Sequence, residues 1–235
     1  MHKQRLRALS FGLALTFIGG QACSTDQEID KGLHYYMKGL SLYRGYDGQA
    51  DKKKGCDHFE QSAKLNNSRG QVEYGNCYKF GEGREQDVEK AVYWYKKAAD
   101  SGETQGQFLL GALYLLHKNY KEYRKEGLDL VTKAWSAKHA DAGFLIGVSY
   151  YQGIVNQANY SKALEYFQLS GELGSIQSQI VMHEIYTKGL YKQAPDSKKA
   201  EFWKKKVLGN ERYQVNEGFI NNMKNNLRVN KLGIE

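Results

Sequence analysis

Proline is almost absent from this chain of 235 residues, which has one proline against 25 glycines. Proline usually accompanies glycine in turns, so its scarcity indicates that many of the glycines lie within regular, helical packing. The chain also lacks long apolar runs: charged residues (26%) interrupt the hydrophobic ones (41%), which excludes a multispan membrane protein. Its 30 aromatic side chains are too many for intrinsic disorder. What remains is a folded chain of one or two domains.

The first 22 residues have the pattern of a bacterial export signal. An apolar stretch at residues 8–20, too short to span a bilayer, is followed by a small-x-small end at Gly20 and Ala22. Three basic residues and no acidic one precede it: Lys3, Arg5 and Arg7. Removing this segment lowers the net charge from +8 to +5 and leaves no basic stripe, so nucleic acid is not predicted as a partner. We predict export to the periplasm.

Cys23 directly follows this segment and allows two kinds of processing. Residues 18–23 resemble a lipoprotein signal, in which a small residue precedes an acylated cysteine. That motif usually has leucine where Gly20 stands, and ordinary cleavage after Ala22 is the alternative. In either case residues 23–29 are predicted to form a short tether, and lipidation of Cys23 would be the only link to a membrane.

Cys56 and Cys77 form an even pair in a chain predicted to be exported. A disulfide is the usual state of such a pair in an oxidising compartment. The alternative is two buried free thiols that fill helix interfaces, because cysteine is among the most buried residue types.

The strongest pattern is a period of 36 residues. Glycines recur at Gly39, Gly75, Gly111 and Gly147. Three residues after each stand Leu42, Tyr78, Tyr114 and Tyr150, and six residues after each stand Gly45, Gly81, His117 and Gly153, with Gly189 one period further on. A period of this length is typical of a solenoid.

Each period holds two helical segments separated by a break. In the second unit, Gly70, Tyr74 and Tyr78 share one face of a helix, Gly81 and Gly83 interrupt it, and residues 88–100 form a second amphipathic segment. Such a pair cannot bury its apolar face alone, so stacked pairs make the core. We predict an all-α, right-handed α-solenoid of about five helix-turn-helix repeats over residues 30–208. Residues 209–235 are predicted to form a capping helix and tail.

The second unit carries a motif that resembles a known family, the Sel-one-like repeat of the tetratricopeptide-type α-solenoids. Its residues are Gly75, Tyr78, Gly81, Gly83, Asp87, Lys90, Ala91, Trp94, Tyr95, Lys97, Ala98, Ala99 and Gly102. The resemblance implies a non-enzymatic scaffold that binds other proteins. Some exported members are immunity proteins held beside antibacterial phospholipase effectors of type VI secretion, and others are periplasmic regulators.

Catalytic motifs are absent from the sequence: there is no nucleophile elbow, no H-E-x-x-H and no phosphate-binding loop. The histidines occupy scattered repeat positions, so the repeat geometry builds no cluster from them. We therefore predict no catalytic, metal-binding or cofactor-binding residue. A hydrolase is the least supported function.

The first helix of each pair lines the concave surface of such solenoids, which makes its remaining positions candidates for partner binding. The candidates are Tyr36, Leu40, Tyr43, Lys79, Phe108, Leu115, Phe144 and Tyr151. The alternative, a thicker core, is favoured for Phe108 and Phe144, whereas a binding groove is favoured for Tyr43, Leu115 and Tyr151. The hypothesis is an immunity protein that occludes a lipase-type effector; the alternative is a regulator or assembly factor acting on an envelope sensor or enzyme.

Overall fold

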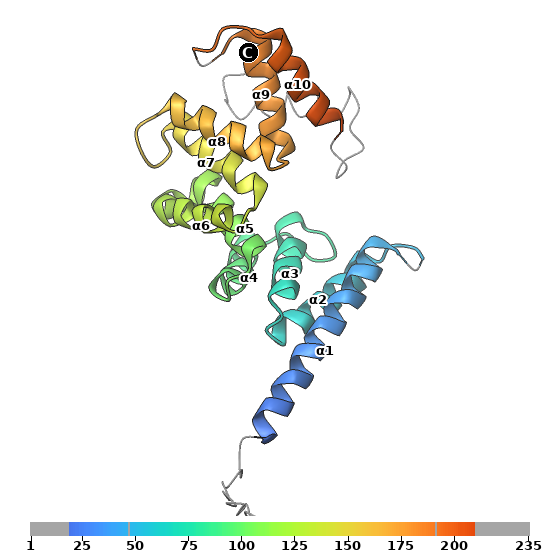
Figure 1. Ribbon diagram of the computed structural model, residues 1–235. Helices are drawn as coiled ribbons and strands as arrows, with labels where there is room; N and C mark the ends of the chain where they lie inside the picture. The colour runs from blue at the N-terminus through green and yellow to red at the C-terminus, as the bar shows by residue number, and fades with distance from the viewer. Residues whose placement is uncertain (1–18, 47, 191, 210–235) are drawn as a thin grey trace, which may run out of the picture.

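The computed structural model describes residues 19–46, 48–190 and 192–209, and within these ranges the chain is entirely helical (Figure 1). In chain order the helices are α1 (Gly19–Arg44), α2 (Lys52–Lys64), α3 (Ser68–Phe80), α4 (Val88–Asp100), α5 (Thr104–Leu116), the 3-10 helix η1 (Lys118–Tyr123), α6 (Arg124–Ser136), α7 (Ala140–Gln152), α8 (Tyr160–Glu172), α9 (Ile176–Lys188) and α10 (Ser197–Leu208). The predicted all-α fold is confirmed.

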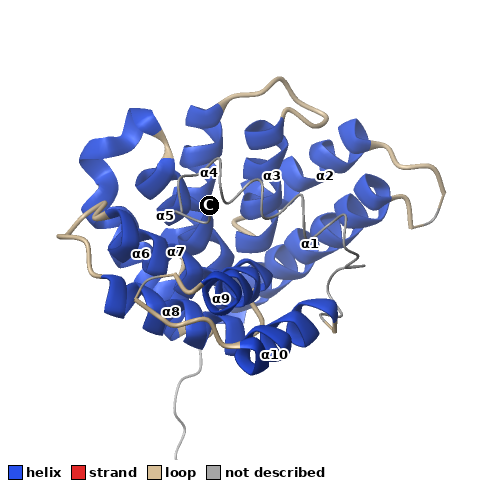
Figure 2. Cartoon of the chain, turned by 90° about the horizontal axis from the view of Figure 1, so that it is seen from above, coloured by secondary structure: helices blue, strands red, loops and turns tan. Residues whose placement is uncertain are grey.

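Successive helices pack in five pairs, α1/α2, α3/α4, α5/α6, α7/α8 and α9/α10, and each pair stacks on the next. Each odd-numbered helix also contacts the next odd-numbered helix, while successive even-numbered helices in the described chain make no comparable contact. The stack therefore curves toward the odd-numbered helices, as the view along it shows (Figure 2). We call the surface formed by α1, α3, α5, α7 and α9 the inner face. This arrangement is the α-solenoid predicted from the period.

The recurring glycines lie where paired helices cross. A β-carbon on Gly75 would lie 2.6 Å from the ring of Tyr95, and one on Gly39 or Gly147 would lie 2.6 Å from the ring of Phe59 or Phe167. These aromatic residues follow their glycines by the same 20 positions, so one contact repeats along the stack. The prediction that glycines lie within helical packing is confirmed at these three positions.

The glycines that stand six residues after the recurring ones mark the ends of helices. Gly81, Gly153 and Gly189 follow α3, α7 and α9 with φ values of 68°, 62° and 72°, a left-handed conformation that glycine adopts without strain. In the third unit His117 occupies this position with φ of −83°, and the chain continues into η1. Asp196 is the N-cap of α10: its carboxylate accepts a hydrogen bond of 3.0 Å from the Lys199 backbone N–H.

At its N-terminal end the described chain is helical from Gly19, so residues 23–29, predicted as a tether, belong to α1. Residues 27–29 are exposed. The side chain of Cys23, residues 1–18 of the predicted export signal and residues 210–235 of the predicted cap lie outside what the structure describes. No helix in the described ranges is both long and apolar enough to cross a membrane.

Candidate partner-binding site on the inner face

The predicted contact residue Leu115 is a core residue. It is only 1% exposed and packs in a cluster with Val131 and Ile146, between α5, α6 and α7. Its neighbour Leu116 is 53% exposed. Consecutive helical residues point about 100° apart, so the outward position is one residue later than the one we predicted.

Phe108 and Phe144 are half-buried and pack against the core, as the thicker-core alternative predicts. The Phe108 ring stacks on His139 with centroids 4.2 Å apart, and the Phe144 ring lies 5.8 Å from Phe167. Tyr151 is half-buried against the core of the last two repeats. These side chains thicken the core of the C-terminal half.

In the first repeat, Tyr36, Leu40 and Tyr43 all pack against the core cluster around Phe59. The Tyr43 hydroxyl also donates a hydrogen bond to the Glu82 carboxylate, which lies in the loop after α3. Burial, followed by this bond to Glu82, raises the pKa of the Tyr43 hydroxyl. Tyr43 therefore joins the first repeat to the second.

An open apolar pocket of about 280 Å³ lies between the C-terminal ends of α3 and α5. The residues that line it are Lys79, Phe80, Tyr95, Leu109, Ala112, Leu113, Leu116 and His117. Of these, only Lys79 is in the predicted set. Phe80 and Leu116 are 63% and 53% exposed, so two large apolar side chains stand in solvent beside a cavity. Exposed apolar groups gathered around a hollow are typical of a surface that binds another molecule.

Tyr95 reaches the pocket from α4, the outer helix of the second pair, and closes it from behind. Its side chain is 1% exposed and crosses Gly75, where only a glycine leaves room for the ring. The Tyr95 hydroxyl donates a 2.7 Å hydrogen bond to Asn76 Oδ1, and Asn76 Nδ2 donates one of 3.0 Å to Glu73. Tyr95, which forms the floor of the pocket, is thus held in place, and its hydroxyl already has an acceptor.

Lys79 supplies the one permanent charge among the lining residues. It is half-buried, and burial lowers the pKa of its ammonium group. None of the lining residues carries a carboxylate, and Lys79 makes no ion pair within the described part of the chain. On the opposite wall, His117 Nδ1 accepts a 3.3 Å hydrogen bond from the Asn119 backbone N–H.

Seven of the eight lining residues are absent from the predicted set, among them the exposed pair Phe80 and Leu116. The periodicity contains a signal for two of them, because Phe80 and Leu116 are 36 residues apart in a register that continues to Gln152 and Lys188. That register is apolar only in the second and third repeats, which are the two that build the pocket.

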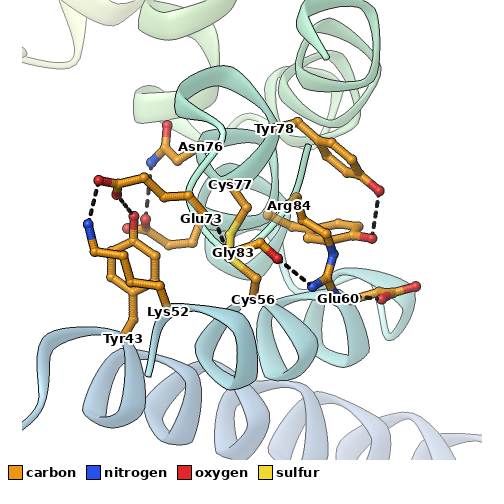
Figure 3. Close-up of a disulfide and its surroundings, with 12 residues drawn as sticks. Tyr43, Lys52, Cys56, Glu60, Glu73, Asn76, Cys77, Tyr78, Gly83 and Arg84 are labelled. Carbon is orange, nitrogen blue, oxygen red and sulfur yellow. Dashed lines mark hydrogen bonds and ion pairs between the residues drawn. A yellow bond between two sulfur atoms is a disulfide. The ribbon is translucent and has the colours of Figure 1, made fainter. Parts of the chain in front are cut away.

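A disulfide is anchored on α3 two residues before Lys79 (Figure 3). Cys56, early in α2, is bonded to Cys77, late in α3, with their Cα atoms 6.2 Å apart. Both residues are buried. The predicted bridge between the first and second repeats is therefore present in the structure, in place of two free thiols. It holds the end of α3 that carries Lys79 and Phe80.

The loop after α3 is attached to the first repeat on both sides of the disulfide (Figure 3). Lys52 forms an ion pair with Glu82, and Arg84 forms ion pairs of 2.7 Å with Asp57 and 3.2 Å with Glu60. At Gly83 a β-carbon would meet the Lys52 carbonyl oxygen at 2.4 Å. These contacts fix the course of the loop at the edge of the pocket. In the described residues no group of three or more histidine, cysteine or acidic side chains is arranged to hold a metal ion.

The paired helices define the chain as an α-solenoid repeat protein. Residues 32–67, 68–103 and 140–175 match the family model of the Sel1 repeat, the Sel-one-like repeat whose motif the second unit carries. The chain is a Sel1 repeat protein. The matched ranges leave out residues 104–139, the unit in which His117 and η1 replace the glycine turn.

A solved structure shows the same fold. A Sel1 repeat protein from Oxalobacter formigenes is similar with a TM-score of 0.69 and 22% identity, over 87% of this chain and 81% of that one. Two immunity proteins of Pseudomonas aeruginosa superpose less closely, with TM-scores of 0.46 and 0.45 and identities of 20% and 17%. Those two matches cover 75% of this chain and 81% and 80% of the other proteins. At these identities the likeness concerns the fold alone. Sel1 repeat solenoids are typically non-catalytic scaffolds that bind other proteins.

Proposed function

We propose that this chain is an exported scaffold that binds a single partner protein through the pocket between α3 and α5. The observation that carries the proposal is the pair Phe80 and Leu116, more than half exposed beside a preformed apolar cavity. Binding energy in protein interfaces concentrates where a few large side chains fill pockets. The disulfide and the loop contacts hold this surface in place before binding, which lowers the entropic cost of association.

The partner we propose is a toxic effector of the lipase type, which the chain occludes in the periplasm as an immunity protein. Two sequence features support this: the export pattern of residues 1–22 and the resemblance to a family whose exported members include such proteins. A regulator of an envelope sensor or enzyme would use the same pocket on a different partner, so the identity of the partner separates the two functions.

Acidic substitutions in the pocket are expected to abolish partner binding. Phe80→Asp and Leu116→Asp each place a charge where the partner's apolar surface would be buried, and should weaken binding by at least about thirty-fold, or 2 kcal/mol. The matched control is Tyr93→Asp, since Tyr93 is 54% exposed on the outer helix α4. The measurement is co-purification from the periplasm, followed by binding of the recovered partner to each purified variant.

The functional part of the proposal is tested in cells that lack the gene. They should be killed by sibling cells that deliver the effector, and the recovered partner should hydrolyse phospholipid until the wild-type chain is added. Equal survival of deleted and parental cells would rule out immunity. A partner that binds the two pocket variants as tightly as the Tyr93→Asp control would rule out the pocket as the binding site.

A further inference from the structure

We propose that the pocket recognises a protein segment in which a large apolar side chain stands within one helical turn of an aspartate or glutamate. This deepens the proposed function and depends on it: the apolar side chain enters the cavity between Phe80 and Leu116, and the carboxylate binds the Lys79 ammonium group.

The size and lining of the cavity favour a side chain as the occupant. About 280 Å³ is just below the range of about 300–1,000 Å³ that is typical of small-molecule sites. Its walls are mainly Phe80, Leu109, Leu113 and Leu116, and the hydroxyl of Tyr95 at its floor is already bonded to Asn76. A polar group that entered deeply would lose its water without finding a new partner there, whereas an aromatic or aliphatic side chain would gain from burial.

The charge requirement comes from Lys79. A half-buried ammonium group has lost part of its hydration, and a carboxylate from the partner would compensate it with a charge-assisted hydrogen bond. Two acidic groups close to Lys79 in the sequence already have other partners. Glu82, three residues on, is engaged by Lys52 and Tyr43, and Glu73 accepts from Asn76.

Two other charged side chains that are shielded from solvent, Arg84 and Glu184, have ion-pair partners. Arg84 has Asp57 and Glu60, and Glu184 has Lys188 at 3.4 Å. Since the lining residues include no carboxylate, the surface is complementary to a segment that is apolar and acidic together.

The test uses the chain from residue 23 onward, with its disulfide formed, and random peptides of about twelve residues displayed on phage. Peptides are selected on the wild-type chain, and those that excess partner displaces, or that fail to bind Leu116→Asp, are sequenced. These peptides should carry an acidic residue within four positions of a large apolar one. Lys79→Glu should weaken these peptides at least tenfold. Lys96→Glu, the same charge change at an exposed position of α4, should leave them unchanged.

A charge exchange makes the test specific. Replacing the acidic residue of a selected peptide by lysine should weaken its binding to the wild-type chain and restore its binding to Lys79→Glu. Peptides that need Leu116 but show no acidic preference, or bind Lys79→Glu normally, overturn this inference and leave the proposed binding site standing. Selected peptides that are indifferent to both Leu116 and Lys79 overturn the binding site as well.

Discussion

Replacing Cys56 and Cys77 together by alanine lowers the free energy of unfolding by about 3 kcal/mol. The two residues are 21 positions apart, and opening a loop of that length restores roughly this much conformational entropy to the unfolded chain. The loss is concentrated at the junction of the first two repeats, because the bridge joins α2 to α3. Urea unfolding of the purified wild-type chain and the double variant, followed by circular dichroism, measures the difference.

Reduction provides the control for this substitution. In the presence of a thiol reductant, the free energy of unfolding of the wild-type protein should fall close to that of the double variant. The free energy of unfolding of the variant should be the same with and without reductant. Alanine is preferred to serine because both cysteine side chains are buried, and a buried hydroxyl without an acceptor would add its own cost. A wild-type unfolding curve that is identical with and without reductant would contradict a stabilising disulfide.

The solenoid could be predicted from the sequence because the same physical requirement recurs every 36 residues. Gly75 is glycine because the Tyr95 ring lies against it, and the pair returns as Gly39 with Phe59 and Gly147 with Phe167. Close crossings of paired helices are therefore recognisable in the sequence as a small residue and a large one at a constant spacing. Helix ends leave a similar trace, in the left-handed glycines Gly81, Gly153 and Gly189.

The pocket could be predicted only in part, because its lining depends on which side of α5 faces solvent. The stretch FLLGALYLL in that helix is apolar all around, so no polar face marks which side meets solvent. Leu115 and Leu116 are equivalent by composition, and only the packing of α5 against α6 and α7 separates the buried one from the exposed one. Lys79 could be predicted because a lysine within an apolar register is conspicuous.

Tertiary contacts determine the loops, which the period does not predict. The segment after α3 owes its course to Lys52, Asp57 and Glu60, which belong to the preceding repeat and do not recur together in another unit. The segment after α5 lacks a glycine at His117 and forms η1 instead of a short turn. The pocket lies beside these two segments, between the C-terminal ends of α3 and α5.

Gly75→Val is expected to lower the free energy of unfolding by about 3 kcal/mol. A β-carbon at this position would lie 2.6 Å from Cε1 and 2.7 Å from Cδ1 of Tyr95, well inside van der Waals contact. The ring cannot withdraw easily, because it is 1% exposed and its hydroxyl is bonded to Asn76. Overpacking of this kind typically costs about 1–3 kcal/mol, and valine adds two methyl groups beyond its β-carbon. Helix propensity predicts the opposite sign, since valine is a better helix former than glycine.

The substitution Tyr95→Leu tests whether the clash with the Tyr95 ring is the cause of the destabilisation by Gly75→Val. If the clash with the ring causes the loss, Gly75→Val should cost much less in the Tyr95→Leu background, and the two substitutions should be strongly non-additive in urea unfolding. Because Tyr95 is also the floor of the pocket, Gly75→Val should weaken partner binding at temperatures where the variant is still folded. Equal costs in both backgrounds would show that the glycine is not required by Tyr95, and would remove the physical basis for interpreting the 36-residue glycine register as a series of helix crossings.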